Sequence, residues 1–470
     1  MIYTDTRDKS VTVDFKTAVL DGMNGRTGGL YLPATFPRLS AELVNKTTDP
    51  SFRDLAFEMA KPYVAGEIPD SDLAAIIQDA YPFPAKTVAV DKTAYMLELF
   101  HGPTCAFKDF GARLMARVMS YFNRNENSAL HILVATSGDT GSAVGSAFHG
   151  VPGLDVTILY PEGKVSKLQE KQLATFDDNV RALRVRGTFD DCQRLVKTAF
   201  TDAALRGKLR LSSANSINIA RLLPQSFYYM YAALVVRNGS WRNNKLENPA
   251  IIAVVPSGNF GNLTSGLIAR EMGAPLAGFV AATNSNRTVP DWIATGEYRA
   301  RASVETYANA MDVGAPSNYE RIAAMYTLKD VRHLFASYWL DNDGILAAIQ
   351  DCFSRTGYTV DPHGAVAWQA WSDIRAGGFE RLAAGSGGDG TKPGLTPNLP
   401  DWSGEVLKKN AVGILLETAH PAKFSDTVRK AIGRTPVIPD RLERVLKLAD
   451  RAIPMENSYA DFRDWLLSTL

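Results

Sequence analysis

The sequence predicts an α/β protein with two lobes of parallel-rich sheets flanked by helices and an additional N-terminal lobe. Short apolar runs typical of buried strands alternate with amphipathic stretches typical of helices over most of the chain. The chain has 470 residues, which is more than one ordinary core accommodates. We expect an N-terminal lobe at residues 1–90, a smaller lobe at 91–215 and a larger lobe at 216–470.

Each predicted element follows from its own pattern. Apolar runs predict strands over residues 93–100, 130–135, 156–160, 180–185, 251–255, 276–281 and 412–416. Periodic or small-residue stretches predict helices over residues 107–122, 142–149, 190–200 and 263–272. The stretch 377–404 is loose in composition and predicts a solvated insertion, whereas residues 440–470 predict helical packing.

Composition excludes several classes of function. Hydrophobic residues make up 46%, charged residues 21%, and the formal net charge is +1, so no broad basic field is available for nucleic acid. No apolar run approaches the ~20 residues of a membrane span, and the charged first residues do not resemble a secretory signal. Three cysteines cannot form a paired framework, which favours reduced thiols and a cytoplasmic location. The histidines show no metal-ligand spacing, so we expect no metal site.

Lys108 lies where a predicted strand gives way to a predicted helix. Burial and the positive end of a helix dipole both disfavour an ammonium group, so we expect the pKa of Lys108 to be lowered. A lysine with a lowered pKa condenses with an aldehyde to form a Schiff base. An ordinary first-turn lysine is the alternative interpretation, and Lys108 alone does not decide between the two.

Two polar, glycine-containing turns also follow predicted strands. Residues 257–262 (Ser-Gly-Asn-Phe-Gly-Asn) combine glycines with the start of a helix, which lets backbone N–H groups converge on a phosphate. Residues 136–142 (Thr-Ser-Gly-Asp-Thr-Gly-Ser) add hydroxyls and one carboxylate. In each case a structural turn with helix caps is the alternative. Since ligands of parallel sheets bind beyond the carboxyl ends of the strands, both turns and Lys108 predict one shared site.

These segments together resemble the threonine synthases, pyridoxal-phosphate enzymes of the fold type (type II) of the tryptophan synthase β subunit. The resemblance rests on residues 101–110, 135–141, 256–262 and 417–424, and the opening 27–33 is also similar. It implies that Lys108 binds the cofactor as a Schiff base and moves protons. It further implies a cofactor-phosphate loop and a contact with the pyridine nitrogen, made by Gly258, Asn259, Phe260, Gly261, Asn262 and Thr418.

The same resemblance implies a set of substrate contacts. A loop closes over the substrate carboxylate, and a helix face with i, i+3 spacing supplies an amide and a guanidinium for the substrate. These residues are Thr136, Ser137, Asp139, Thr140, Asn218 and Arg221. Cys105 and His420 are expected to be structural.

The implied reaction converts O-phospho-L-homoserine and water to L-threonine and phosphate, by γ-elimination and addition of water at Cβ. This is a lyase step of threonine biosynthesis with a small-molecule substrate, and relatives of this length suggest a monomer. Two alternatives stay open. One is another enzyme of the same fold type, such as a serine or threonine dehydratase, and the other is a related protein that binds ligands without turnover.

Overall fold

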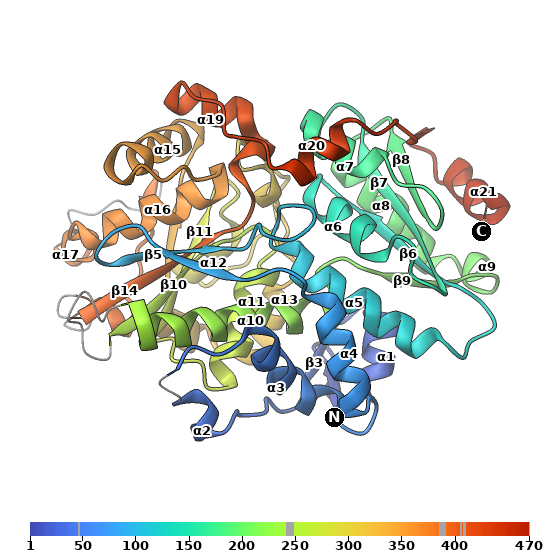
Figure 1. Cartoon of the computed structure of the whole chain (residues 1–470), viewed down its shortest axis with the longest axis horizontal. Coiled ribbons are helices and arrows are strands. Elements are labelled where there is room, and N and C mark those ends of the chain that lie inside the picture. The colour runs from blue at the N-terminus through green and yellow to red at the C-terminus, as the bar shows by residue number, and fades with distance from the viewer. Residues whose placement is uncertain (46–47, 241–248, 385–391, 405–406, 408–409, 470) are drawn as a thin grey trace.

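The computed structural model describes residues 1–45, 48–240, 249–384, 392–404, 407 and 410–469. Within these residues the chain forms three sheets, two of which are large and lie side by side under a shared layer of helices (Figure 1). No helix of the described chain combines the length and apolarity that crossing a membrane requires.

The larger sheet has seven strands in the order β13-β12-β11-β10-β14-β5-β4. Its five inner strands are parallel, and the two edge strands are antiparallel to their neighbours. The strands are β4 Lys86–Ala89, β5 Ala94–Glu98, β10 Ala250–Pro256, β11 Gly278–Thr283, β12 Phe335–Trp339, β13 Gly394–Leu395 and β14 Ala411–Glu417.

The second large sheet has five parallel strands in the order β15-β8-β7-β6-β9. They are β6 Leu130–Ala135, β7 Leu154–Pro161, β8 Val180–Val185, β9 Arg210–Ser213 and β15 Ile453–Met455. A small antiparallel sheet near the N-terminus joins β1 Tyr3–Asp5, β2 Thr12–Val13 and β3 Tyr31–Pro33.

Helices cover both faces of the two large sheets. The helices of the first half are α1 Phe15–Asp21, α2 Ala41–Val44, α3 Phe52–Val64, α4 Asp70–Ala80, α5 Lys108–Asn123, α6 Asp139–Phe148, α7 Lys167–Ala174, α8 Phe189–Thr201, α9 Ala203–Arg206, α10 Ile219–Val235 and the π-helix η1 Val236–Ser240. Those of the second half are α11 Gly261–Glu271, α12 Thr288–Thr295, η2 Asn309–Met311, α13 Tyr319–Met325, α14 Leu328–Leu334, α15 Asn342–Thr356, α16 Pro362–Arg375, α17 Gly378–Ala383, η3 Asp401–Ser403, η4 Pro421–Phe424, α19 Ser425–Ile432, α20 Asp440–Leu446 and α21 Tyr459–Thr469.

Strand β10 illustrates why the inner strands are apolar without alternation. Ile251, Ala253 and Val255 face the core that contains α10 and α11. Ile252 and Val254 face a second core, which contains α15 and α16. Because both faces of the strand are buried, every position favours an apolar side chain.

The N-terminal region belongs to the same core as the two large sheets. Buried residues of α3 and α4 pack into one cluster with those of α5, α10 and the inner faces of both sheets. Strand β4, within the predicted N-terminal lobe, pairs with β5 in the seven-stranded sheet.

Sheet membership also departs from the other predicted boundaries. Strand β5 lies in the range of the predicted smaller lobe but pairs with β14 of the larger sheet. Strand β15 lies in the range of the predicted larger lobe but completes the five-stranded sheet beside β8. Both exchanges are long-range pairings, which local patterns do not encode.

Most predicted elements are confirmed, with informative differences at their ends. Strands β6 and β8 have the predicted bounds, whereas β11 begins at Gly278, two residues later than predicted. Helix α6 begins at Asp139 and not at 142, since Gly141 lies within the helix while Gly138 is its N-cap. The insertion 377–404 carries α17, β13 and η3, so it is not uniformly loose, and its residues 385–391 lie outside the described chain.

Candidate active site

A cavity of about 510 Å³ opens at the carboxyl ends of the strands of both large sheets. It brings together most of the residues predicted to form the site, although they come from distant parts of the chain. The predicted residues that line it are Lys108, Thr136, Ser137, Thr140, Arg221, Gly258, Asn259, Phe260, Gly261, Asn262 and Thr418. Asp139 and Asn218 are not among the lining residues.

Lys108 is held at the cavity wall by the two chain segments that leave β5 and β14. The N–H of Phe107 donates to the carbonyl oxygen of Thr418 at 2.8 Å, and the N–H of His420 donates to that of Cys105 at 3.0 Å. Helix α5 then begins at Lys108 itself. Burial lowers the pKa of Lys108 to about 8, although the nearby Asp139 carboxylate opposes this shift. The lysine is therefore neutral far more often at neutral pH than an exposed lysine.

Asp139 faces Lys108 and a second lysine, and its role as a substrate contact stays a prediction. Its Oδ2 lies 4.0 Å from Lys108 Nζ, and its Oδ1 lies 2.7 Å from Lys423 Nζ. Burial disfavours the carboxylate, but Lys423 and Lys108 outweigh burial and hold the pKa of Asp139 well below its usual range. The carboxylate acts on the lysines and does not line the cavity.

The turn 257–262 presents unsatisfied backbone donors to the cavity. Phe260 adopts a left-handed conformation, with φ of 58°, and no side chain caps the start of α11. The first N–H groups of a helix have no acceptor within it, so those of Gly261 and Asn262 are available to a ligand. A Cβ at Gly258 would lie 2.7 Å from the carbonyl oxygen of Ala310, so only glycine fits this turn without movement. The turn is a neutral cradle suited to an anion.

Side chains around this turn hold it in place. Asn259 Nδ2 donates to Ser216 Oγ at 2.6 Å, and Asn259 Oδ1 accepts from the N–H of Ser317 at 2.5 Å. Asn262 Oδ1 accepts from the hydroxyl of Tyr228 at 2.6 Å. Asn262 Nδ2 is buried and has no hydrogen-bond partner among the described residues, so this donor is available to a ligand.

The turn 136–140 follows β6 and is braced from within. Thr136 Oγ1 accepts from the N–H of Gly138 at 3.0 Å and from that of Gly141 at 2.9 Å. Thr136 is 1% exposed, so its hydroxyl shapes the turn. Ser137 and Thr140 are half-buried and line the cavity, where their hydroxyls are the ones available to a ligand.

Arg221 and Asn218 behave differently, although the sequence placed them on one helix face. Arg221 is 2% exposed; one guanidinium nitrogen donates to Ala214 at 2.7 Å, while Nε has no partner in the described chain. Burial lowers the pKa of Arg221 to about 10, so the group stays charged at neutral pH.

Asn218 lies outside the residues that line the cavity, and its role as a substrate contact stays a prediction. Asn218 is the N-cap of α10 and does not lie within the helix. Its Oδ1 accepts from Ala220 at 2.9 Å, and its Nδ2 donates to Val19 and Ser213 at 2.8 and 3.1 Å. These bonds tie the side-chain amide of Asn218 to the backbone at the start of the helix that carries Arg221.

Several residues of the site were not predicted. His363 lines the cavity; its Nδ1 donates to Asp361 at 2.5 Å and its Nε2 accepts from the N–H of Ala310 at 3.2 Å. Lys423 lies in the similar segment 417–424, but the sequence predicts no role for it. Ala310 and His363 are 53 residues apart in the chain, so only the fold brings these two together. The described residues contain no group of three or more side chains able to hold a metal ion.

The residues fit pyridoxal phosphate. A lysine of lowered pKa suits the aldehyde, the uncapped turn before α11 suits a phosphate, and Thr418, 5% exposed, sets a short hydroxyl side chain in the same cavity. Together with parallel strands that end at one cavity, these features define a pyridoxal-phosphate-dependent enzyme of fold type II.

Comparison with known proteins gives the family. Residues 2–81 match the family model of the threonine synthase N terminus, residues 82–382 that of pyridoxal-phosphate dependent enzymes and residues 403–465 that of the threonine synthase C-terminal region. Threonine synthase of Haemophilus influenzae is 38% identical over 97% of both chains. The crystal structure of Escherichia coli threonine synthase superimposes with a TM-score of 0.85, 34% identity and 100% coverage of both chains. A cofactor-bound threonine synthase from Brucella melitensis has a TM-score of 0.82, with 32% identity over 99% of this chain and 98% of that one. The chain belongs to the threonine synthase family.

Proposed function

We propose that the protein converts O-phospho-L-homoserine and water to L-threonine and phosphate. The observation that carries the proposal is one cavity with two separate features suited to phosphate. One is the neutral turn before α11, and the other is the buried guanidinium of Arg221. A cofactor phosphate and a substrate phosphate need two such features, whereas a substrate without phosphate needs only one.

The cofactor-side roles go to the residues at the strand ends. Lys108 binds the cofactor aldehyde, the N–H groups of Gly258 to Asn262 hold its phosphate, and the hydroxyl of Thr418 meets the pyridine nitrogen. Bound pyridoxal phosphate supplies the electron-withdrawing group that stabilises negative charge on the substrate carbon atoms. Since Lys108 has a lowered pKa, it accepts and returns protons at Cα and Cβ near neutral pH.

The substrate-side roles follow from the remaining lining residues. The hydroxyls of Ser137 and Thr140 and the start of α6 hold the substrate carboxylate. Arg221 binds the phosphate that leaves when the bond from Cγ to oxygen breaks. The oxygen of water then forms a bond to Cβ, and Cγ ends as the methyl group of threonine.

Three broader properties remain proposals. We propose that the chain acts as a monomer, in the cytoplasm, with the cofactor and substrate held between the two large sheets. Light scattering tests the first, since it should give the mass of one chain at all protein concentrations tried. A mass that doubles with concentration would contradict it.

The test of function compares two released products. Purified protein with pyridoxal phosphate should release phosphate and L-threonine in equal amounts from O-phospho-L-homoserine, and little ammonia from L-threonine or L-serine. Faster ammonia release would identify a dehydratase. Absence of both products from a protein that binds the cofactor would identify a binding protein without turnover.

Arg221 offers a sharper discrimination. Arg221→Met should raise the KM for O-phospho-L-homoserine and leave cofactor affinity unchanged, because within the described residues the guanidinium donates to Ala214 and not to the turn before α11. Arg113, which binds the backbone of α4 at 2.7 and 2.8 Å, is the control arginine. Equal effects of Arg221→Met and Arg113→Met on KM would contradict the role of Arg221.

A further inference from the structure

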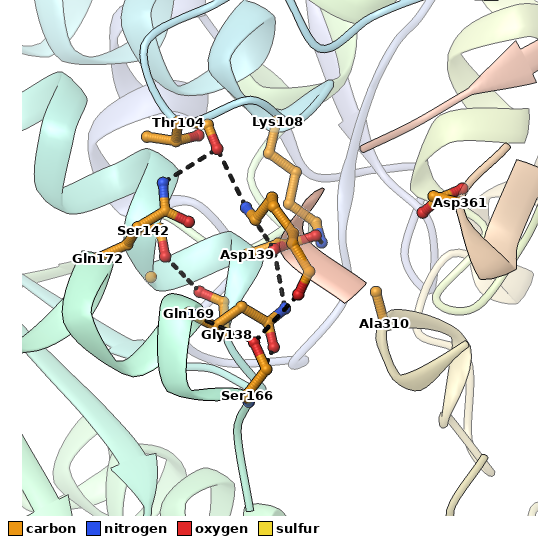
Figure 2. A network of polar contacts seen from close by, with 12 residues as sticks. Thr104, Lys108, Gly138, Asp139, Ser142, Ser166, Gln169, Gln172, Ala310 and Asp361 are labelled. Carbon is orange, nitrogen blue, oxygen red and sulfur yellow. Dashed lines mark hydrogen bonds and ion pairs between the residues drawn. The ribbon is translucent and has the colours of Figure 1, made fainter. Parts of the chain in front are cut away.

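Two lysines and one carboxylate form a buried cluster beside the cavity. Lys423, in η4, is 1% exposed, and its Nζ lies 2.7 Å from Asp139 Oδ1. The second carboxylate oxygen of Asp139 lies 4.0 Å from Lys108 Nζ. Figure 2 shows Asp139 between Lys108 and the residues around Gln169. One negative charge thus lies between two amino groups and pairs closely with only one of them.

Neutral groups hold this arrangement in position. Lys423 Nζ also donates to the carbonyl oxygen of Thr104 at 3.1 Å, and Gln172 Nε2 donates to the same oxygen at 3.1 Å. Gln169 Nε2 donates to Asp139 Oδ1 at 3.0 Å (Figure 2). These contacts fix Lys423 on one carboxylate oxygen, so the carboxylate cannot turn fully toward Lys108.

Gly138 leaves the space that the Gln169 side chain needs to reach Asp139. Gly138 has φ of 131°, and a Cβ there would lie 2.7 Å from the side-chain amide of Gln169. The missing side chain therefore lets Gln169 reach Asp139. The turn that leads into α6 is shaped to keep the carboxylate on Lys423.

We propose that Lys423 is a positioning residue that holds the Asp139 carboxylate away from Lys108 and thereby keeps Lys108 neutral enough to react. Without the charge of Lys423, Asp139 has Lys108 as its only cationic partner in the cluster, and the two pair as carboxylate and ammonium. With Lys423 in place, the second positive charge also repels a proton on Lys108. The inference rests on the proposed role of Lys108 as the cofactor lysine.

Other charged groups around Lys108 do not replace Lys423. Arg221 adds a positive charge from α10, and Asp361 adds a negative charge from the start of α16. Asp361 already accepts from His363, which lines the cavity, and from the N–H of Gly364. Burial and the nearby Asp361 carboxylate raise the pKa of Glu417 at the end of β14 well above its usual value, which disfavours the charged form of this carboxyl group. In the described part of the chain, Lys423 is the cation closest to the carboxylate that faces Lys108, at 2.7 Å against 4.0 Å for Lys108 itself.

The experiment measures the pKa of Lys108 directly. Full-length protein freed of cofactor is labelled with acetic anhydride across a range of pH, and mass spectrometry gives the labelled fraction of the Lys108 peptide. The wild-type midpoint should lie near 8. Lys423→Met should raise it and Asp139→Asn should lower it, each by roughly 1–3 pH units, the usual effect of a neighbouring charge.

The combined variant separates charge from structure. Lys423→Met with Asp139→Asn should return the midpoint toward the wild-type value, and Lys423→Arg should stay near it. Lys171→Met, in which an exposed lysine of α7 is removed, should leave the midpoint unchanged. If Lys423 had a purely structural role, the Lys108 midpoint would shift in the same direction in Lys423→Met and Asp139→Asn, or would shift in neither.

Each possible result of this experiment either supports or overturns the inference on Lys423. An unchanged Lys108 midpoint in Lys423→Met would overturn the inference. If that variant does not fold, Lys423→Gln takes its place, and an unchanged Lys108 midpoint in Lys423→Gln would likewise overturn the inference. A separate result would contradict the proposed function. If borohydride reduction of the holoenzyme attached the cofactor to a lysine other than Lys108, the assignment of Lys108 would be wrong.

Discussion

Two turns of the molecule share one geometry and differ in how they handle charge. Each follows a buried parallel strand, contains a residue with positive φ and opens a helix that no N-cap side chain caps. The turn before α11 has no charged residue in Ser257 to Asn262, and its donors face the cavity. The turn before α6 contains Asp139, which is turned away toward Lys423. The comparison indicates that a strand–turn–helix junction keeps backbone donors for an anion only to the extent that its own side chains leave them unused.

Thr136 explains why the turn before α6 has fewer free backbone donors than the turn before α11. Its hydroxyl takes the N–H groups of Gly138 and Gly141, so the turn before α6 satisfies part of its own helix terminus. In the part of the chain that the structure describes, no N-cap side chain takes the N–H groups of the turn before α11. The turn before α11 is therefore suited to a dianion that stays bound. The turn before α6 is suited to a singly charged carboxylate that binds and is released in each turnover.

The largest expected effect comes from removing the lysine that both turns serve. Lys108→Ala should lower turnover by at least about a thousandfold, since the reacting amine and its proton transfers are lost. The cofactor should still bind, because the turn before α11 retains its donors. Absorbance and equilibrium dialysis measure the two quantities separately. Turnover close to that of wild type would contradict the role of Lys108.

Gly258→Ala should affect the cofactor and spare the fold. The added Cβ would lie 2.7 Å from the backbone of residues 310 and 311, so the turn or its neighbour must shift. Overpacking of this kind costs about 2 kcal/mol, which corresponds to roughly a thirtyfold weaker cofactor affinity. Gly207→Ala is the control, because its Cβ would meet only ordinary contacts from 3.4 Å. Unfolding of Gly258→Ala without separable cofactor loss would favour a purely structural turn.

Thr136→Val should act on the substrate and leave the cofactor bound. Two N–H groups lose their acceptor, which costs about 1.5 kcal/mol and should raise the KM for O-phospho-L-homoserine roughly tenfold. Thr157→Val, in the adjacent strand β7, removes a buried hydroxyl that has no partner among the described residues, so it should change little. A matching loss of cofactor affinity in Thr136→Val would remove the distinction between the two turns.

The smallest effect is expected at Thr418. Thr418→Val keeps the shape of the side chain and removes the hydroxyl proposed to meet the pyridine nitrogen, which costs about 1 kcal/mol. Cofactor affinity should fall roughly fivefold, with thermal stability unchanged. Calorimetric titration with pyridoxal phosphate measures the change. Wild-type affinity would leave Thr418 with only its backbone bond to Phe107.

The sequence was sufficient where the signal is local. Strands β6 and β8 were predicted with their observed bounds, because continuous apolar runs bounded by polar residues mark buried parallel strands. Strand β9, Arg210–Ser213, was missed because it is short and largely polar. Asn218 was misplaced because i, i+3 spacing does not distinguish an N-cap from a helix face.

The site was predictable in its outline and not in its charges. Lys108 and both turns are contiguous motifs, and the cavity that they line confirms that they meet. The partnership of Asp139 with Lys423 depends on η4 packing against the start of α6, which no local pattern records. Asp139 was therefore interpreted as a substrate contact, although its carboxylate is already used.

The course of the final segment has a consequence for biosynthesis. After β14 the chain passes Thr418 and Lys423, crosses to the five-stranded sheet and adds β15 at its edge (Figure 1). A ribosome makes Lys108 early and these partners late. The amine of Lys108 therefore exists in the nascent chain long before the second partner of the Asp139 carboxylate does, and the cavity is complete only after the segment with Thr418 and Lys423 has been made.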